Sequence, residues 1–98
     1  MQISLEGRSA IITGGSRGMG RAMSLRFAES GADVAIVSRS QDLLDETKAE
    51  VEAVAKGRVM AVSCDVTDAV AIADMFGTVN GEFGKVDILV NNAGTSAR

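Results

Sequence analysis

The feature that most constrains this chain is its glycine-rich stretch, Thr13-Gly14-Gly15-Ser16-Arg17-Gly18-Met19-Gly20. It follows the apolar run at 9–12 and precedes a segment whose apolar residues recur at helical spacing. The first N–H groups of a helix lack internal partners and carry partial positive charge, so a glycine-rich turn between a strand and a helix suits an anionic group. Glycines let that group approach the backbone, and we expect positive φ angles in the turn. The stretch predicts a phosphate-binding corner.

The spacing of the glycines separates this corner from two other phosphate-binding patterns. Gly14, Gly18 and Gly20 give Thr-Gly-x-x-x-Gly-x-Gly, which differs from the dinucleotide pattern Gly-x-Gly-x-x-Gly. A Walker-type loop needs Lys and then Ser or Thr after its last glycine, whereas Arg21 and Ala22 follow here. The glycines alone leave open a surface turn that binds nothing.

Strand-like and helix-like segments alternate along the chain. We expect strands over residues 9–13, 33–38, 58–62 and 85–90. We expect helices over 17–30, from a Ser40 cap to Gly57, and from a cap at Thr67 or Asp68 to a turn marked by Gly81 and Gly84. The run 33–38 is nearly all apolar, which is typical of a strand covered on both faces. The sequence therefore predicts one α/β domain over residues 1–98, a doubly wound parallel sheet of order 3-2-1-4.

Composition removes several classes of function. The 98 residues carry a net charge of -3 and contain no His, Tyr, Trp or Pro. No block of Lys or Arg points to nucleic acid, no apolar run is long enough for a membrane helix, and the N-terminus lacks the features of a signal peptide. Without His, neither a His-based triad nor a Cys/His zinc site can form, and we expect no metal. The single Cys64 fits a buried small residue and a cytoplasmic protein.

Four informative loops are expected at one edge of the sheet. In an open parallel sheet the ligand lies beyond the carboxyl ends of the strands, where the strand order reverses. The loops at 13–20, 38–40, 64–66 and 91–94 all follow predicted strands and converge there. Their convergence predicts a cofactor site without reference to any family.

The end of the second strand bears on the choice of nicotinamide cofactor. An acidic residue there would bind the ribose 2′-hydroxyl of NAD, but this chain has Ser38 and Arg39, and Asp33 lies at the other end of the strand. Arg17 is within reach of the same position. Two guanidinium groups suit a 2′-phosphate, so we predict NADP(H) over NAD(H). The alternative is that Arg39 is a solvated loop residue.

Three motifs together resemble the short-chain dehydrogenase/reductase family. The glycine pattern is followed in the family's order by Asp65-Val66, expected at the end of the third strand, and by Asn91-Asn92-Ala93-Gly94. The resemblance covers essentially the whole chain and implies the truncated front half of a Rossmann-type member. The 3-oxoacyl-[acyl-carrier-protein] reductases are the nearest such members.

The resemblance implies roles for individual residues. Met19, where the family usually has Ile, would offer its N–H to the pyrophosphate, and Ser16 would contact the adenosine ribose or its phosphate. Asp65 would contact the adenine edge by its carboxylate and Val66 by its N–H, and the 91–94 loop would lie along the riboses. The predicted cofactor-binding residues are Gly14, Ser16, Arg17, Gly18, Met19, Gly20, Ser38, Arg39, Asp65, Val66, Asn91, Ala93 and Gly94.

The resemblance also implies what this chain lacks. The family's catalytic Ser and Tyr-x-x-x-Lys lie downstream of the Asn-Asn-Ala-Gly loop, so we expect no catalytic residue before Arg98. The parent protein would use NADP(H) to reduce a carbonyl, a ketone or 3-oxoacyl thioester, to an alcohol, with the small-molecule substrate held by the absent part and the full protein a homo-oligomer. The alternative is a non-catalytic module that binds a dinucleotide or nothing. An extended-family epimerase is disfavoured, because Arg17 stands where its pattern needs glycine.

Overall fold

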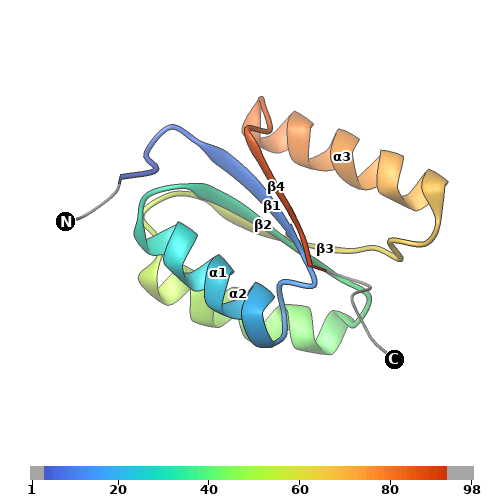
Figure 1. Cartoon of the computed structure of the whole chain (residues 1–98), viewed down its shortest axis with the longest axis horizontal. Helices are drawn as coiled ribbons and strands as arrows, with labels where there is room; N and C mark the ends of the chain where they lie inside the picture. Colours follow the sequence, from blue (N-terminus) through green and yellow to red (C-terminus); the bar gives the residue numbers. More distant parts are fainter. Residues whose placement is uncertain (1–3, 93–98) are drawn as a thin grey trace.

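The computed structural model describes residues 4–92 as a three-layer α/β fold. Its elements, in chain order, are β1 (Ser9–Thr13), α1 (Gly18–Glu29), β2 (Asp33–Ser38), α2 (Gln41–Val54), β3 (Val59–Ser63), α3 (Ala69–Phe83) and β4 (Ile88–Asn91). Helix α3 covers one face of the sheet, and α1 and α2 cover the other (Figure 1). None of the helices within residues 4–92 has the length and apolar character needed to cross a bilayer.

The four strands form one parallel sheet in the order β3-β2-β1-β4. Ser9 pairs with Asp33, Ala10 with Ile88 and Val34 with Val59. The sheet confirms the predicted fold class and strand order, and it puts the reversal of strand order between β1 and β4. The carboxyl ends of all four strands therefore lie at one edge.

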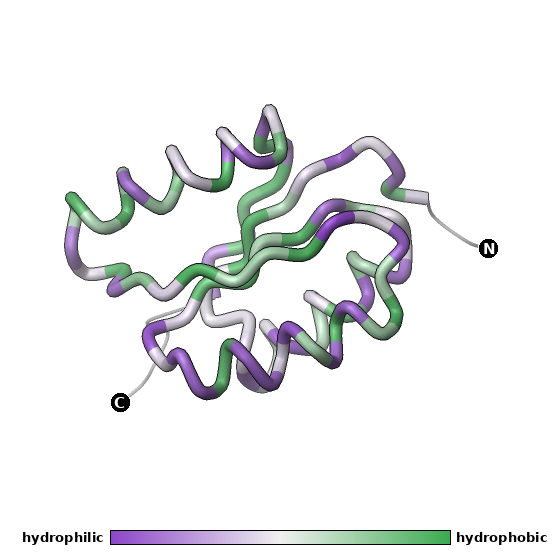
Figure 2. Tube along the Cα trace, turned by 180° about the vertical axis from the view of Figure 1, so that it is seen from behind, coloured by the Kyte–Doolittle hydropathy of each residue, from purple (hydrophilic) through white to green (hydrophobic). Residues whose placement is uncertain are grey.

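The hydrophobic core has two halves, one on each face of the sheet. Ile11 belongs to the half under α3, with Met75, Val79 and Phe83 of that helix. The neighbouring Ile12 points the other way and packs in the half under α1 and α2. All residues of β1 are buried, as the central strands of a covered sheet should be. Figure 2 shows the strands as the mostly hydrophobic middle of the molecule, with hydrophilic residues spread over the helices.

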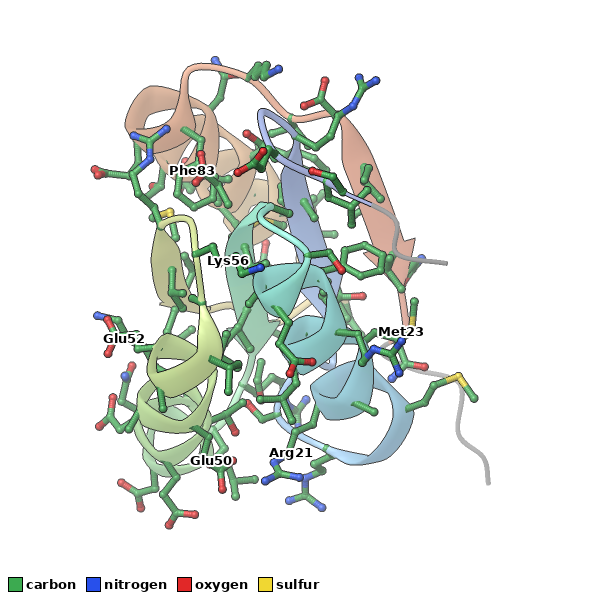
Figure 3. All side chains as sticks on the ribbon, turned by 90° about the vertical axis from the view of Figure 1, so that its left-hand side faces the viewer. Arg21, Met23, Glu50, Glu52, Lys56 and Phe83 are labelled. Atoms are coloured by element: carbon green, nitrogen blue, oxygen red, sulfur yellow. The ribbon has the colours of Figure 1, made fainter. Side chains whose placement is uncertain are left out.

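An ion pair joins α1 and α2, which pack on the same face of the sheet. The Nε atom of Arg21 in α1 donates to Oε1 of Glu50 in α2 over 2.8 Å, and both side chains are about half exposed (Figure 3). Other charged residues of α2, such as Asp45 and Glu46, are also exposed. Arg21 and the acidic residues of α2 thus form a solvated face.

The glycine expected to end α2 has a different role. The helix ends at Val54, before Gly57, and Ala55 is already extended. A Cβ on Gly57 would lie 2.7 Å from the carbonyl oxygen of Ala32. Gly57 is therefore needed for the close approach of the chain entering β3, and the prediction that it ends the helix was wrong.

The remaining differences are shifts of boundaries. Gly81 lies inside α3, and Gly84 alone ends that helix, with φ of +83° and its N–H donated to Asn80. Strand β3 begins one residue later than expected, and Asp65 lies two residues beyond its end. Strand β4 begins only at Ile88, and the preceding Asp87 binds the backbone of Ser9 through both its carboxylate and its N–H. Helix α1 is flanked by Arg17 and Ser30 as its caps instead of including them.

Candidate functional site

The turn after β1 folds back over the end of β2. The carbonyl oxygen of Val37 accepts the N–H of Gly14 at 2.8 Å and that of Gly15 at 3.3 Å. Gly14 has φ of +69° and Gly18 of +48°, which confirms the expectation of positive φ angles in this turn. The two bonds hold the start of the glycine loop against the edge of the sheet.

Gly20 allows the first turn of α1 to rest on this loop. A Cβ at residue 20 would overlap the carbonyl oxygen of Gly14 and would lie 2.9 Å from Nδ2 of Asn92. The Ser24 hydroxyl donates to the Gly20 carbonyl at 2.8 Å and is fully buried. Only glycine fits at position 20, so the helix start is fixed close to the loops after β1 and β4.

The N-terminus of α1 is open to an anionic group. Its N-cap residue is Arg17, which makes no side-chain cap, and the first turn contains no acidic residue. Beside it, the Oγ atom of Ser16 is buried and has no hydrogen-bond partner among residues 4–92. Met19, in the first turn of α1, is 70% exposed. Unpaired N–H groups together with a buried hydroxyl lacking a partner fit a bound phosphate.

The loop after β2 is fixed by hydrogen bonds on both sides. The Ser38 carbonyl accepts the Cys64 N–H at 3.0 Å, and the Ser38 hydroxyl accepts the Ser40 N–H at 3.3 Å. The Ser63 hydroxyl donates to the Arg39 carbonyl at 3.3 Å. Ser40 caps α2 by accepting the Leu43 N–H, as predicted. The backbone of Arg39 is thereby held between β3 and α2, while its side chain is exposed.

The loop after β3 presents an ionised carboxylate. Thr67 donates both its hydroxyl, at 2.6 Å, and its N–H, at 2.9 Å, to Oδ1 of Asp65. These bonds, and more weakly the positive charge of Arg39, hold the pKa of the Asp65 carboxyl below its usual range. Burial, followed by the charges of Asp65 and Asp68, raises the pKa of the Cys64 thiol. The Cys64 side chain is buried, as the sequence predicted.

These loops enclose a cavity of about 600 Å³ at the carboxyl edge of the sheet. Predicted site residues in its lining are Gly14, Arg17, Ser38, Arg39, Asp65 and Val66. Neither Arg17 nor Arg39 forms an ion pair with any residue in the described part of the chain. The lining of the cavity thus combines two arginines that form no ion pair within residues 4–92, the carboxylate of Asp65 and apolar side chains.

A second hollow, of about 570 Å³, lies at the opposite edge of the sheet and differs in its charges. In this hollow the Arg58 guanidinium already has partners within the protein. It binds the Asp33 carboxylate at 2.9 Å and the Glu82 carbonyl at 2.8 Å, and it lies 5.1 Å from the centre of the Phe83 ring. Asp33 is occupied there as well, far from the carboxyl edge, as the sequence suggested. This hollow has no free cation comparable with Arg17 or Arg39.

The end of β4 is joined to β1 through one buried hydroxyl. Thr13 Oγ1 donates toward Asn91 Oδ1 at 3.1 Å and accepts the Asn92 N–H at 3.0 Å. Asn91 therefore lies beside the glycine loop, at the position where the strand order reverses. Ala93 and Gly94 lie outside the described residues.

The structure brings together more residues than sequence analysis selected. Val37, Ser40, Cys64 and Thr67 also line the cavity. Their signal in the sequence was position, since each lies near the carboxyl end of β2 or β3. Ser16, Gly18, Met19 and Gly20 form the neighbouring helix start and do not line this cavity. No group of His, Cys, Asp and Glu within residues 4–92 is arranged to hold a metal ion.

Comparison with known proteins gives the family. The sequence model of the short chain dehydrogenase family matches residues 8–98. A 2-dehydro-3-deoxy-D-gluconate 5-dehydrogenase from Pseudoalteromonas atlantica is 43% identical over 98 residues, which are 99% of this chain and 38% of that protein. The chain belongs to the short-chain dehydrogenase family, whose similar members are oxidoreductases.

Solved structures of the family have the same fold. L-sorbose reductase from Gluconobacter frateurii, complexed with NADPH and L-sorbose, is 37% identical with a TM-score of 0.91 over 99% of this chain and 37% of that one. NAD⁺-bound xylitol dehydrogenase is 32% identical with a TM-score of 0.87 over 91% of this chain and 34% of that one. Similar proteins thus include one bound to each nicotinamide cofactor. The chain spans 28–51% of the length of the curated relatives it matches.

The described residues fit the dinucleotide that such relatives bind. The open helix start, the partnerless Ser16 hydroxyl and the tight contact at Gly20 suit a pyrophosphate at α1. The cavity between the loops after β2 and β3 is lined by Arg17, Arg39 and the carboxylate of Asp65.

Proposed function

We propose that this chain forms the NADP(H)-binding part of a short-chain oxidoreductase that interconverts a carbonyl and an alcohol. The family and its oxidoreductase members support the reaction class. When bound, the reduced nicotinamide supplies the hydride. The residues proposed to hold the cofactor are Gly14, Ser16, Arg17, Gly18, Met19, Gly20, Ser38, Arg39, Asp65, Val66 and Asn91, together with Ala93 and Gly94 outside the described residues.

The observation that carries the cofactor preference is the pair of uncommitted arginines. Arg17 and Arg39 come from different loops, line one cavity and form no ion pair within residues 4–92. Strand β2 ends at Ser38, whose side chain carries no negative charge that would repel a 2′-phosphate. A charge-assisted hydrogen bond contributes on the order of 1.5–3 kcal/mol, so one lost guanidinium contact should change affinity by about tenfold or more.

Titration of the full protein with NADPH and NADH tests this preference. We expect the wild type to bind NADPH at least about tenfold more tightly, and Arg39→Asp to lose or reverse that preference. Arg26→Asp is the matched control, because it makes the same charge change on the exposed last turn of α1. Equal affinity for the two cofactors in both the wild type and Arg39→Asp would reject the proposal.

The chemical step needs groups that these 98 residues do not contain. The chain has no Tyr and no His, so it does not itself contain the family's Tyr-x-x-x-Lys. That the relatives are two to four times longer supports this division of the protein. We therefore assign the chain the roles of binding and orienting the cofactor, and assign carbonyl-substrate binding and proton transfer to the rest of the protein.

A non-catalytic dinucleotide-binding module is the second candidate, favoured by the absence of Tyr from the chain. The two candidates differ in the parent sequence: a Tyr-x-x-x-Lys on a helix after the Asn-Asn-Ala-Gly loop supports the enzyme. Its absence there, with cofactor binding retained, supports the module.

A further inference from the structure

Thr67 holds the Asp65 carboxylate in a single orientation. Both of its hydrogen bonds, from the hydroxyl at 2.6 Å and the N–H at 2.9 Å, reach the same oxygen, Oδ1. Two donors on one oxygen restrict rotation of the carboxylate and leave Oδ2 without a hydrogen bond from any residue within 4–92. Asp65 and Thr67 both line the cavity at the carboxyl edge.

The turn that carries Thr67 is anchored to the start of α3. The Asp65 carbonyl accepts the Asp68 N–H at 3.0 Å. The Asp68 side chain caps α3 by accepting the N–H groups of Val70 at 2.9 Å and Ala71 at 3.2 Å. The turn that holds the Asp65 carboxylate is therefore fixed in position by the fifteen-residue helix α3.

The chemistry of the cavity indicates which group the free oxygen receives. Arg17 and Arg39 supply the positive charge for a phosphate, and the partly exposed Val66 contributes apolar surface for a planar base. An ionised carboxylate accepts hydrogen bonds and cannot donate them. It therefore suits the amino group of adenine and not the 6-oxo oxygen of hypoxanthine, which has no proton to give.

We propose that Thr67 is a positioning residue that fixes the Asp65 carboxylate for the 6-amino group of adenine and so sets discrimination against 6-oxo purines. This inference rests on the proposed function, because it requires that the cavity holds the adenosine of a dinucleotide. The two hydrogen bonds of Thr67 to Asp65 do not join one helix or strand to another. The side chain that caps α3 is that of Asp68.

The test compares two dinucleotides in the full protein. NADPH and reduced nicotinamide hypoxanthine dinucleotide phosphate differ at position 6 of the purine and in the proton that hypoxanthine carries on N1, and calorimetry gives a Kd for each. We expect the wild type to prefer NADPH, and Thr67→Val to lose roughly threefold to tenfold in NADPH affinity with little change for the hypoxanthine analogue. Thr67→Ser keeps the hydroxyl and should retain the wild-type ratio.

The ratio of the two Kd values separates positioning from mere stability. A structural role would weaken both dinucleotides by the same factor in Thr67→Val, and that result would overturn the inference, as would an unchanged ratio. Thr78→Val in α3 is the control, because its hydroxyl binds only the Asp74 carbonyl, one helical turn away. Thr67→Ala replaces Thr67→Val if the latter unfolds at a lower temperature than the wild type.

The same data distinguish the two proposals. A wild type that binds neither dinucleotide rejects the proposed function and the inference together. A wild type that binds NADPH, with a Kd ratio that Thr67→Val leaves unchanged, rejects the inference alone.

Discussion

At the scale of single residues, the arginines at the two ends of the sheet differ in whether they have partners within the protein. Arg58, where the strands begin, is held by the Asp33 carboxylate and by the last carbonyls of α3. Arg17 and Arg39, where the strands end, have no such partners within residues 4–92. Paired cations at one end serve the fold, and unpaired cations at the other are available to a ligand.

Gly20 offers a prediction at this scale. A methyl group there would overlap the Gly14 carbonyl, so Gly20→Ala must displace the glycine loop or the helix start. We expect a loss of about 1–3 kcal/mol in the free energy of unfolding, as for other overpacked sites, with weaker binding of NADPH. Urea unfolding of the full protein measures the first effect, and titration measures the second.

Gly77→Ala is the control for this prediction. Gly77 lies within α3, and a Cβ there would meet nothing within 4 Å. Alanine should raise the free energy of unfolding by up to about 1 kcal/mol through helix propensity. If Gly20→Ala proves as stable as the wild type, the tight contact between α1 and the glycine loop does not exist as described.

At the scale of elements, the sequence was most informative where periodicity and burial agree. The bounds of β1 and β2 were predicted correctly, because both strands are apolar runs covered on two faces. The end of α2 was not, because Gly57 serves a close approach to Ala32, a contact between residues 25 positions apart. The predicted start of β4 was also wrong, since the strand begins where its pairing with β1 begins, at Ala10 and Ile88, which are distant in the sequence. Local pattern cannot report such distant contacts.

The site followed the same rule. The loops at 13–20, 38–40 and 64–66 lie at the carboxyl edge as predicted, since topology alone brings the carboxyl ends of the strands together, whereas residues 93 and 94 of the fourth loop lie outside the described residues. The role of Thr67 was missed, because a hydrogen bond that orients a carboxylate has no periodic signal. The sequence suggested only that Thr67 or Asp68 would cap α3, and Asp68 does so.

Asp87 gives a pH-dependent prediction for the contact between β1 and the segment before β4. Its carboxylate accepts the Ser9 N–H at 2.8 Å, and this bond, followed by Lys85, holds the pKa of the Asp87 carboxyl below its usual range. A carboxyl whose pKa is lowered by folding stabilises the protein above its unfolded pKa, near 4, and that stabilisation is lost as the pH falls through the folded value. Asp87→Asn should therefore be less stable than the wild type at neutral pH.

The difference in unfolding free energy between the wild type and Asp87→Asn should shrink as the pH falls below about 4. Urea unfolding at several pH values measures this difference. Asp74→Asn, on the exposed surface of α3, controls for loss of the same charge. A difference for Asp87→Asn that stays constant down to about pH 3 would show that the ionised carboxylate is not what matters.

At the scale of the whole molecule, the fold collects four loops that are distant in the sequence. The glycine loop and the end of β4 are joined through Thr13, and the loops after β2 and β3 through Ser38 and Cys64. The resulting edge has an open helix start, two uncommitted arginines and an oriented carboxylate. These features of the edge are the basis of the proposal that the chain binds NADP(H).

A crystal structure of the full protein with NADPH tests that claim most directly. We predict the pyrophosphate at the start of α1 beside Gly18 and Met19, the 2′-phosphate within hydrogen-bond distance of Arg39, and the adenine beside Asp65. A structure in which NADPH lies elsewhere, with the cavity between the loops after β2 and β3 filled by the protein's own side chains, would contradict the account.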